Sequence, residues 1–125
     1  MKNINRIAIV TVLGCLSATA AVFAGSGQAS TVSISYYQTY STGTTVPMYG
    51  DVTVTGFNNQ NYSTNSVWLE LHNKNNTIVK QAEAPIGFNG TLYTAQNVAT
   101  NDYHLDLNPD GPNYDSVVAN GKAQN

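Results

Sequence analysis

The sequence predicts a small all-β protein, an antiparallel sandwich of two sheets built from about seven short strands. Apolar residues recur with a period of two along several short segments, and turn-forming residues separate these segments. The composition, with 42% hydrophobic and only 10% charged residues, favours a packed core over disorder. After residue 30 no segment shows the period of about 3.6 residues that marks a long helix.

A secretory signal peptide is predicted over residues 1–30. Two positive charges, Lys2 and Arg6, precede an apolar stretch rich in small residues that runs to Ala24. We expect cleavage between Ala24 and Thr31, where small residues offer two sites. The alternative is an uncleaved membrane anchor, because the stretch is close to the shortest length that spans a bilayer.

Cys15 lies inside this apolar stretch, and the residues before it fit a lipid-attachment motif loosely. It is the single cysteine of the chain. The predicted mature domain, residues 31–125, therefore has no disulfide and no thiol chemistry. We expect one secreted, extracellular domain that is stabilised by its core, a bound ion or oligomerisation.

Each predicted strand shows the alternation of a sheet with one buried face. The first three are 31–40, where valine and isoleucine alternate with serine; 51–57, where valine alternates with threonine; and 66–72, where valine and leucine alternate with polar residues and tryptophan. The last four are 77–81, before Pro85; 91–95, after the hairpin-turn dipeptide Asn89-Gly90; 102–107; and 114–119. The alternation predicts a core made mostly of Val52, Val54, Val67, Leu69, Leu71, Tyr103, Leu105 and Leu107.

Residues 101–105, Asn-Asp-Tyr-His-Leu, resemble the start of the sixth strand of an immunoglobulin-like domain. In that fold a tyrosine at this place bonds back to nearby backbone, an arrangement termed the tyrosine corner. The resemblance implies an immunoglobulin-like sandwich in which the third and sixth strands are antiparallel neighbours. It concerns the fold alone and implies no function.

The side chains on the third and sixth strands that point away from the predicted core are Trp68, Glu70, His72, His104 and Asp106. Two histidines and two carboxylates on one face suit zinc or another divalent ion. The alternative is an ordinary solvated sheet face. An outward Trp68 would suit stacking on a sugar or a partner protein, whereas in an immunoglobulin-like third strand it would point into the core.

A calcium site is a second interpretation of the sixth strand and the residues after it. Asp106, Asn108 and Asp110 supply oxygen ligands at alternate positions, as in the first half of a calcium-binding loop, and Asp115 offers one more. The second half of such a loop is missing, since its twelfth position is Val117. The alternative is a hairpin turn.

The first strand carries no formal charge and continues into Tyr36 and Tyr37. Its high β-propensity, without proline or glycine, is typical of an edge strand that pairs with other chains. Tyr36 and Tyr37 are therefore candidate contact residues for a partner or a second copy. The alternative is an ordinary first strand held within the sheet.

The sequence favours a non-enzymatic binding or assembly module over an enzyme. No nucleophile elbow, zinc-protease motif or phosphate-binding glycine loop occurs. Three lysines face seven acidic residues after residue 30, so nucleic acid is excluded as a partner and membrane insertion of the mature domain is not expected. The expected partner is a protein, a cell-surface glycan or a second copy. A toxin or antimicrobial factor and a small calcium-stabilised domain are the alternatives.

Overall fold

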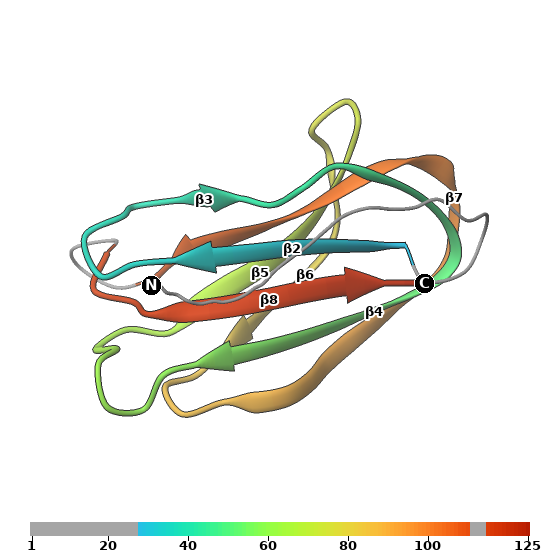
Figure 1. The fold of residues 1–125 in the computed structure, drawn as a ribbon. Helices are drawn as coiled ribbons and strands as arrows, with labels where there is room; N and C mark the ends of the chain where they lie inside the picture. Colours follow the sequence, from blue (N-terminus) through green and yellow to red (C-terminus); the bar gives the residue numbers. More distant parts are fainter. Residues whose placement is uncertain (1–27, 111–114) are drawn as a thin grey trace.

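The computed structural model describes residues 28–110 and 115–125, which form antiparallel strands joined by turns (Figure 1). The strands are β2 (Ala29–Ile34), β3 (Ser41–Thr42), β4 (Val46–Asn58), β5 (Val67–Asn73), β6 (Ile78–Ala84), β7 (Asn89–Pro109) and β8 (Ala119–Gln124). All seven belong to one antiparallel sheet, neither closed nor curled, in the order β2-β8-β4-β7-β5-β6 with β3 beside β7. The predicted all-β class is therefore confirmed. Within the described residues no helix combines the length and the apolar character needed to span a bilayer.

The predicted strands 91–95 and 102–107 are parts of one long strand, β7, so their separation was wrong. The first part of β7 pairs with β4, from Asn89 opposite Phe57 to Tyr103 opposite Val46. The last part pairs with β5, up to Pro109 opposite Val67. Polar residues between the two parts suggested a loop, but irregular pairing with β4 carries the strand through them.

The predicted hairpin turn at Asn89-Gly90 is also wrong, because both residues already pair with β4. The chain turns earlier, at Pro85–Phe88, where the Phe88 N–H donates to the Pro85 carbonyl over 3.0 Å. Gly87 has a φ of 87° at the third turn position. A type II turn needs glycine there, so Gly87 rather than Gly90 sets the turn between β6 and β7, two strands that do not pair with each other.

The first and last strands have different bounds from those predicted. β2 ends at Ile34 because the next residues form a turn, in which the Gln38 N–H donates to the Ser35 carbonyl over 3.0 Å. β8 begins at Ala119, and Ser116 just before it has a φ of 66° that is incompatible with an extended strand. The first half of the predicted strand 114–119 is not extended in its described residues, and residue 114 lies outside them.

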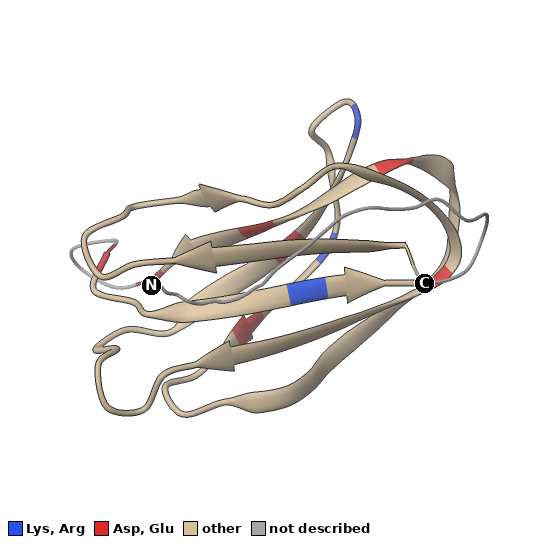
Figure 2. Cartoon of the chain, in the orientation of Figure 1, with Lys and Arg blue, Asp and Glu red and all other residues tan. Residues whose placement is uncertain are grey.

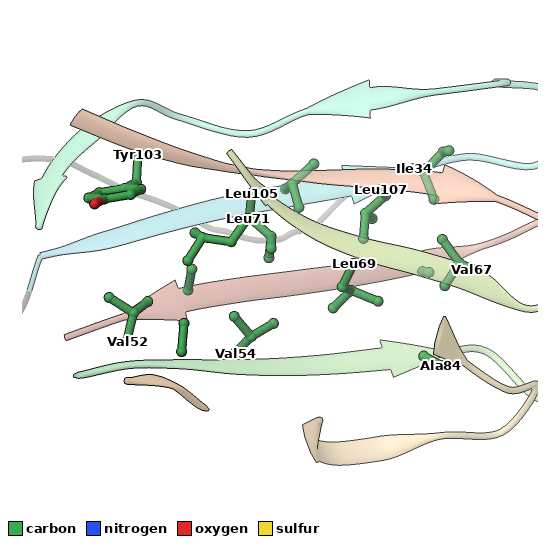
Figure 3. Close-up of a cluster of buried hydrophobic side chains, with 14 of the residues drawn as sticks. Ile34, Val52, Val54, Val67, Leu69, Leu71, Ala84, Tyr103, Leu105 and Leu107 are labelled. Carbon is green, nitrogen blue, oxygen red and sulfur yellow. The ribbon is translucent and has the colours of Figure 1, made fainter. Parts of the chain in front are cut away.

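The predicted core is confirmed: every one of its eight residues is buried. Figure 3 shows the leucines of β5 and of the last part of β7 pointing toward β4, which carries Val52 and Val54. Gly56 of β4 and Gly121 of β8 permit this approach, since a Cβ added at either would come within 3.0 Å of Leu69. The two glycines thus provide the space that Leu69 fills.

Two tyrosine hydroxyls fasten β7 to backbone. Tyr103 is buried, and its hydroxyl donates to the carbonyl of Ala99, four residues upstream, as the predicted tyrosine corner requires. Tyr93 lies within hydrogen-bond distance of the Leu69 carbonyl of β5, at 2.9 Å, and of the Lys80 carbonyl of β6, at 3.2 Å. Burial raises the pKa of the Tyr93 phenol well above its ordinary value, so it remains a donor.

Leu69→Ala tests the phase of β5. The substitution removes a fully buried side chain from between Gly56 and Gly121, so we expect the free energy of unfolding to fall by about 2–5 kcal/mol. Urea denaturation followed by circular dichroism measures it. Ile78→Ala, at an exposed position of β6, serves as the control and should change the free energy of unfolding by less than about 1 kcal/mol. Equal decreases in the free energy of unfolding of the two variants would contradict the inward orientation of Leu69.

Candidate functional site

The polar face of β5 and β7 carries three cross-strand pairs in a row. Trp68 lies opposite Asn108, Glu70 opposite Asp106, and His72 opposite His104. The pairs between them, such as Leu69 with Leu107, belong to the core, so the two-residue period sends these six side chains to the other face. The structure thus brings together the two histidines and two carboxylates that the sequence predicted to share a face.

The imidazoles and carboxylates are in contact. His72 Nε2 lies 3.0 Å from Glu70 Oε1 and 3.4 Å from Asp106 Oδ2, while His104 Nε2 lies 3.4 Å from Asp106 Oδ1. The two imidazole rings stack with centroids 5.1 Å apart and planes inclined by 14°. We call His72, His104, Glu70 and Asp106 the histidine–carboxylate cluster.

Three of the four residues of this cluster are buried, so the alternative of an ordinary solvated sheet face is wrong. Glu70, His72 and Asp106 are only 5%, 4% and 2% exposed. Tyr40, in the segment between β2 and β3, covers them and donates its hydroxyl proton to Asp106 Oδ2. The same hydroxyl oxygen lies 3.3 Å from Glu70 Oε1.

Tyr40 keeps its proton and acts as a hydrogen-bond donor to the cluster. Burial of its hydroxyl, and secondarily the hydrogen bond to Asp106, raises the pKa of the phenol well above its ordinary value. A phenol has a single O–H donor, and its hydrogen bond goes to Asp106. Glu70 therefore depends on other donors, which are the amide of Asn108, 2.9 Å from Oε2, and His72 Nε2 when that nitrogen is protonated.

Burying Glu70 and Asp106 side by side is costly. Like charges directly opposite each other across two strands repel, and a buried carboxylate needs a neutralising partner. No lysine in the described residues forms an ion pair with either carboxylate, and charged side chains are sparse over the strands (Figure 2). The nearby groups that can supply positive charge are the imidazoles of His72 and His104.

Trp68 is half-buried on the polar face, so it is not the inward core tryptophan of an immunoglobulin-like third strand. Its neighbour in the row is Glu70, whose carboxylate is held by Asn108. Trp68 thus lies beside the cluster, at the end of the row away from His72 and His104.

Two of the four residues proposed as calcium ligands, Asp106 and Asn108, make their side-chain contacts across the strands. The carboxylate of Asp106 faces the two histidines, and the Asn108 amide donates to Glu70. Asp115 Oδ1 accepts from the Ser116 hydroxyl at 2.7 Å, and the Asp110 N–H donates to the Ser66 carbonyl. Among the described residues, the group of histidines and acidic residues placed to hold a metal consists of His72, His104 and Asp106.

The first strand does not present a free outer edge along its whole length. The N–H of Thr31 donates to the Thr44 hydroxyl, the Thr44 N–H donates to the Thr31 carbonyl, and the Ser41 hydroxyl donates to the Ser33 carbonyl. These bonds occupy the backbone groups that strand pairing with another chain would need. Tyr36 and Tyr37 lie beyond the end of β2, in the turn that follows it, with their rings in an edge-to-face contact.

No pattern in the sequence indicates the role of Tyr40. It stands at the end of the predicted strand 31–40, and its hydroxyl bonds to Asp106, 66 residues further along the chain. Local alternation carries no information about such a distant contact. The shared face of Glu70, His72 and the two residues of the sixth strand was predicted, because it follows from strand period once the strands are neighbours. The period does not determine which residues lie opposite each other, and that register comes from the structure.

Comparison with known proteins assigns no family. No protein-family model matches the chain, and no curated protein matches it. The function is therefore argued from the geometry of the described residues.

Tyr40→Phe tests whether the phenol holds the cluster together. Without the hydroxyl, Asp106 loses its donor while buried, and the free energy of unfolding should fall by about 1–3 kcal/mol. Tyr37→Phe is the matched control, because Tyr37 is 85% exposed. Thermal and urea unfolding of the two variants give the comparison. Indistinguishable stabilities would show that Tyr40 does not support the buried carboxylate.

Proposed function

We propose that the mature domain is an exported, non-enzymatic binding module that contacts a protein partner through loops at one end of the strands. The surface is formed by residues 35–40, 59–66 and 115–118, which we call the tyrosine-rich loop end. These segments lie where β2, β4 and β7 end and β8 begins, at the left in Figure 1. The observation that carries the proposal is the exposure of Tyr37 and Tyr62, 85% and 66%, on loops that are bonded to one another.

Backbone hydrogen bonds join the three loops. The Ser116 N–H donates to the Tyr36 carbonyl over 2.7 Å, and the Thr64 N–H donates to the Ser116 carbonyl over 2.9 Å. The Asn59 N–H donates to the Val118 carbonyl over 2.9 Å. Because these bonds connect distant parts of the chain, the exposed tyrosines are held on a preorganised surface. Preorganisation lowers the entropic cost of binding.

The composition of the loops supports a protein partner. Tyrosine, serine, threonine and asparagine dominate residues 35–40 and 59–66, and no charged residue occurs in either segment. Binding loops of antibodies have a related composition, because tyrosine offers large contact area with few rotatable bonds and small polar residues supply adaptable hydrogen bonds. Charge depletion is also typical of the centre of protein interfaces.

The proposal includes an immunoglobulin-like sandwich as the finer description of the fold. Three features support it: β7 changes its partner from β4 to β5 along its length, the β5 leucines point toward β4 and β8, and Tyr103 bonds to Ala99. In such domains, loops gather at the two ends of the strands and serve as binding surfaces. The proposed absence of enzymatic activity rests on the missing catalytic motifs.

Substitution of the two exposed tyrosines tests the binding surface. We expect a Tyr37→Ser, Tyr62→Ser double variant to remain folded. It should bind to cells of the organism that produces the protein at least about tenfold more weakly than the wild type, because aromatic anchors dominate interface energies. Flow cytometry with labelled protein measures the binding. Tyr49→Ser is the control, since Tyr49 is exposed and its carbonyl accepts from Asn125, near the C-terminus at the other end of the strands (Figure 1).

Two treatments of the cells separate the possible partners. Protease treatment should abolish binding of the wild-type domain, and periodate oxidation of glycans should leave it. The opposite pattern would replace the protein partner with a glycan. Binding that is equal in the wild type and the double variant would contradict a role for the loop end.

A further inference from the structure

We propose that His72, His104 and Asp106 form a binding site for a divalent transition-metal ion of the zinc class. One candidate ligand atom from each residue lies within 4.8 Å of the other two. The site is on the polar face of β5 and β7, and its three ligands lie outside the tyrosine-rich loop end, although Tyr40 of segment 35–40 bonds to Asp106. The tests of the two proposals use different residues, His104 and Asp106 here and Tyr37 and Tyr62 for partner binding, so either proposal can fail without the other.

Each imidazole nitrogen lies about as far from one Asp106 oxygen as two ligand atoms of a tetrahedral ion lie from each other, although the two nitrogens approach different oxygens. Zinc binds nitrogen and oxygen at about 2.0–2.1 Å, which separates neighbouring ligand atoms by about 3.3 Å. His72 Nε2 and His104 Nε2 each lie 3.4 Å from an oxygen of Asp106. The two imidazoles are now nearly parallel, with planes inclined by 14°, so binding requires the rings to rotate until both lone pairs point at one ion.

An unsatisfied oxygen points to a missing partner. Asp106 Oδ1 is buried and accepts no hydrogen bond, and its approach to His104 Nε2 at 3.4 Å does not meet the geometry of one. Buried carboxylate oxygens are normally bonded, and an exception calls for an explanation such as a missing ion. A metal ion between Asp106 and the imidazoles supplies the bond that Oδ1 lacks.

The charge of the cluster favours a divalent ion. Glu70 and Asp106 are two buried carboxylates in directly opposite positions. A bound ion with two positive charges neutralises both without requiring protonated imidazoles. Glu70 Oε1 lies 3.0 Å from His72 Nε2, outside the group of three candidate ligands.

The ligand types select zinc-class ions over calcium. Imidazole suits zinc, copper and nickel, whereas calcium requires six to eight oxygen ligands. His72 Nδ1 is buried without a hydrogen-bond partner, so the ring lacks the acceptor that usually orients a metal-bound histidine. We therefore expect weaker binding than at a site with such an acceptor, by about 10–100-fold.

The ion has a short path to the site. The His104 side chain is 14% exposed, whereas Asp106 is almost fully covered by Tyr40 and the strands. Tyr40 lies in a segment without strand structure between β2 and β3, and a shift of its ring releases Asp106 Oδ2. Metal entry thus requires a side-chain movement rather than separation of β5 from β7.

The test titrates the full, metal-stripped chain with zinc chloride, and with calcium chloride as the comparison. Calorimetry should give one zinc per chain, and the ring nitrogens of both histidines should shift in NMR spectra. We expect His104→Gln and Asp106→Asn to weaken zinc binding at least about tenfold. Asp102→Asn, on the same strand but outside the ligand group, should bind zinc as the wild type does.

His104→Gln is the decisive variant, because the ring is partly exposed and its replacement leaves the core intact. Circular dichroism first confirms that each variant is folded. The proposal is overturned if millimolar zinc produces neither heat nor histidine shifts, if His104→Gln binds zinc as tightly as the wild type, or if calcium binds as tightly as zinc.

Discussion

The pairing of β5 with β7 in one register is the constraint on which both the core and the polar cluster depend. With Leu69 opposite Leu107, the neighbouring pair must be Glu70 with Asp106, and the next polar pair His72 with His104. Because side chains alternate between faces, a slip of one residue would bring carboxylates into the core and leucines onto the polar face. The core therefore specifies the register, and the register in turn assembles the cluster.

This register also places two carboxylates, Glu70 and Asp106, opposite each other. Two carboxylates opposite each other can stay buried only if protons, hydrogen-bond donors or a cation compensate for them. The chain meets this demand with the Tyr40 hydroxyl, the Asn108 amide and two imidazoles. Tyr40 thereby ties the segment between β2 and β3 to β5 and β7. Ser41 and Thr44, which follow Tyr40 in the chain, bond to the outer edge of β2. The most exposed aromatic side chains described are Tyr37 and Tyr62, in the loops.

The extent to which the sequence predicts the fold depends on how local the deciding interactions are. Alternation placed Val54, Leu69 and Leu105 in the core correctly, since strand period is local and one face is buried. It could not join 91–95 to 102–107, because the continuity of β7 depends on pairing with β4 and β5. It extended the first strand to residue 40, where a turn bonded at Ser35 in fact ends it. Likewise, Asn89-Gly90 has the composition of a turn, but Gly87 supplies the positive φ.

For the candidate site, the sequence predicted which residues share a face but not how deeply they lie. The period of two was sufficient to place His72 and His104 on the same side as Glu70 and Asp106. Their burial depends on Tyr40, which reaches them from a distant part of the chain. The calcium interpretation relied on ligand spacing along one segment, whereas Asp106 is directed across strands toward the histidines. Cross-strand geometry thus outweighs sequence proximity at this site.

The most direct test of the account is a nuclear Overhauser measurement on the aromatic rings of the wild-type protein. The β5–β7 register predicts strong cross-peaks between the ring protons of His72 and His104, whose centroids are 5.1 Å apart, and weaker ones from His72 to the ring of Tyr40. Histidine rings that show no cross-peak to each other, in a protein whose Leu69 and Leu107 are still buried, would contradict the claim that one register builds both faces.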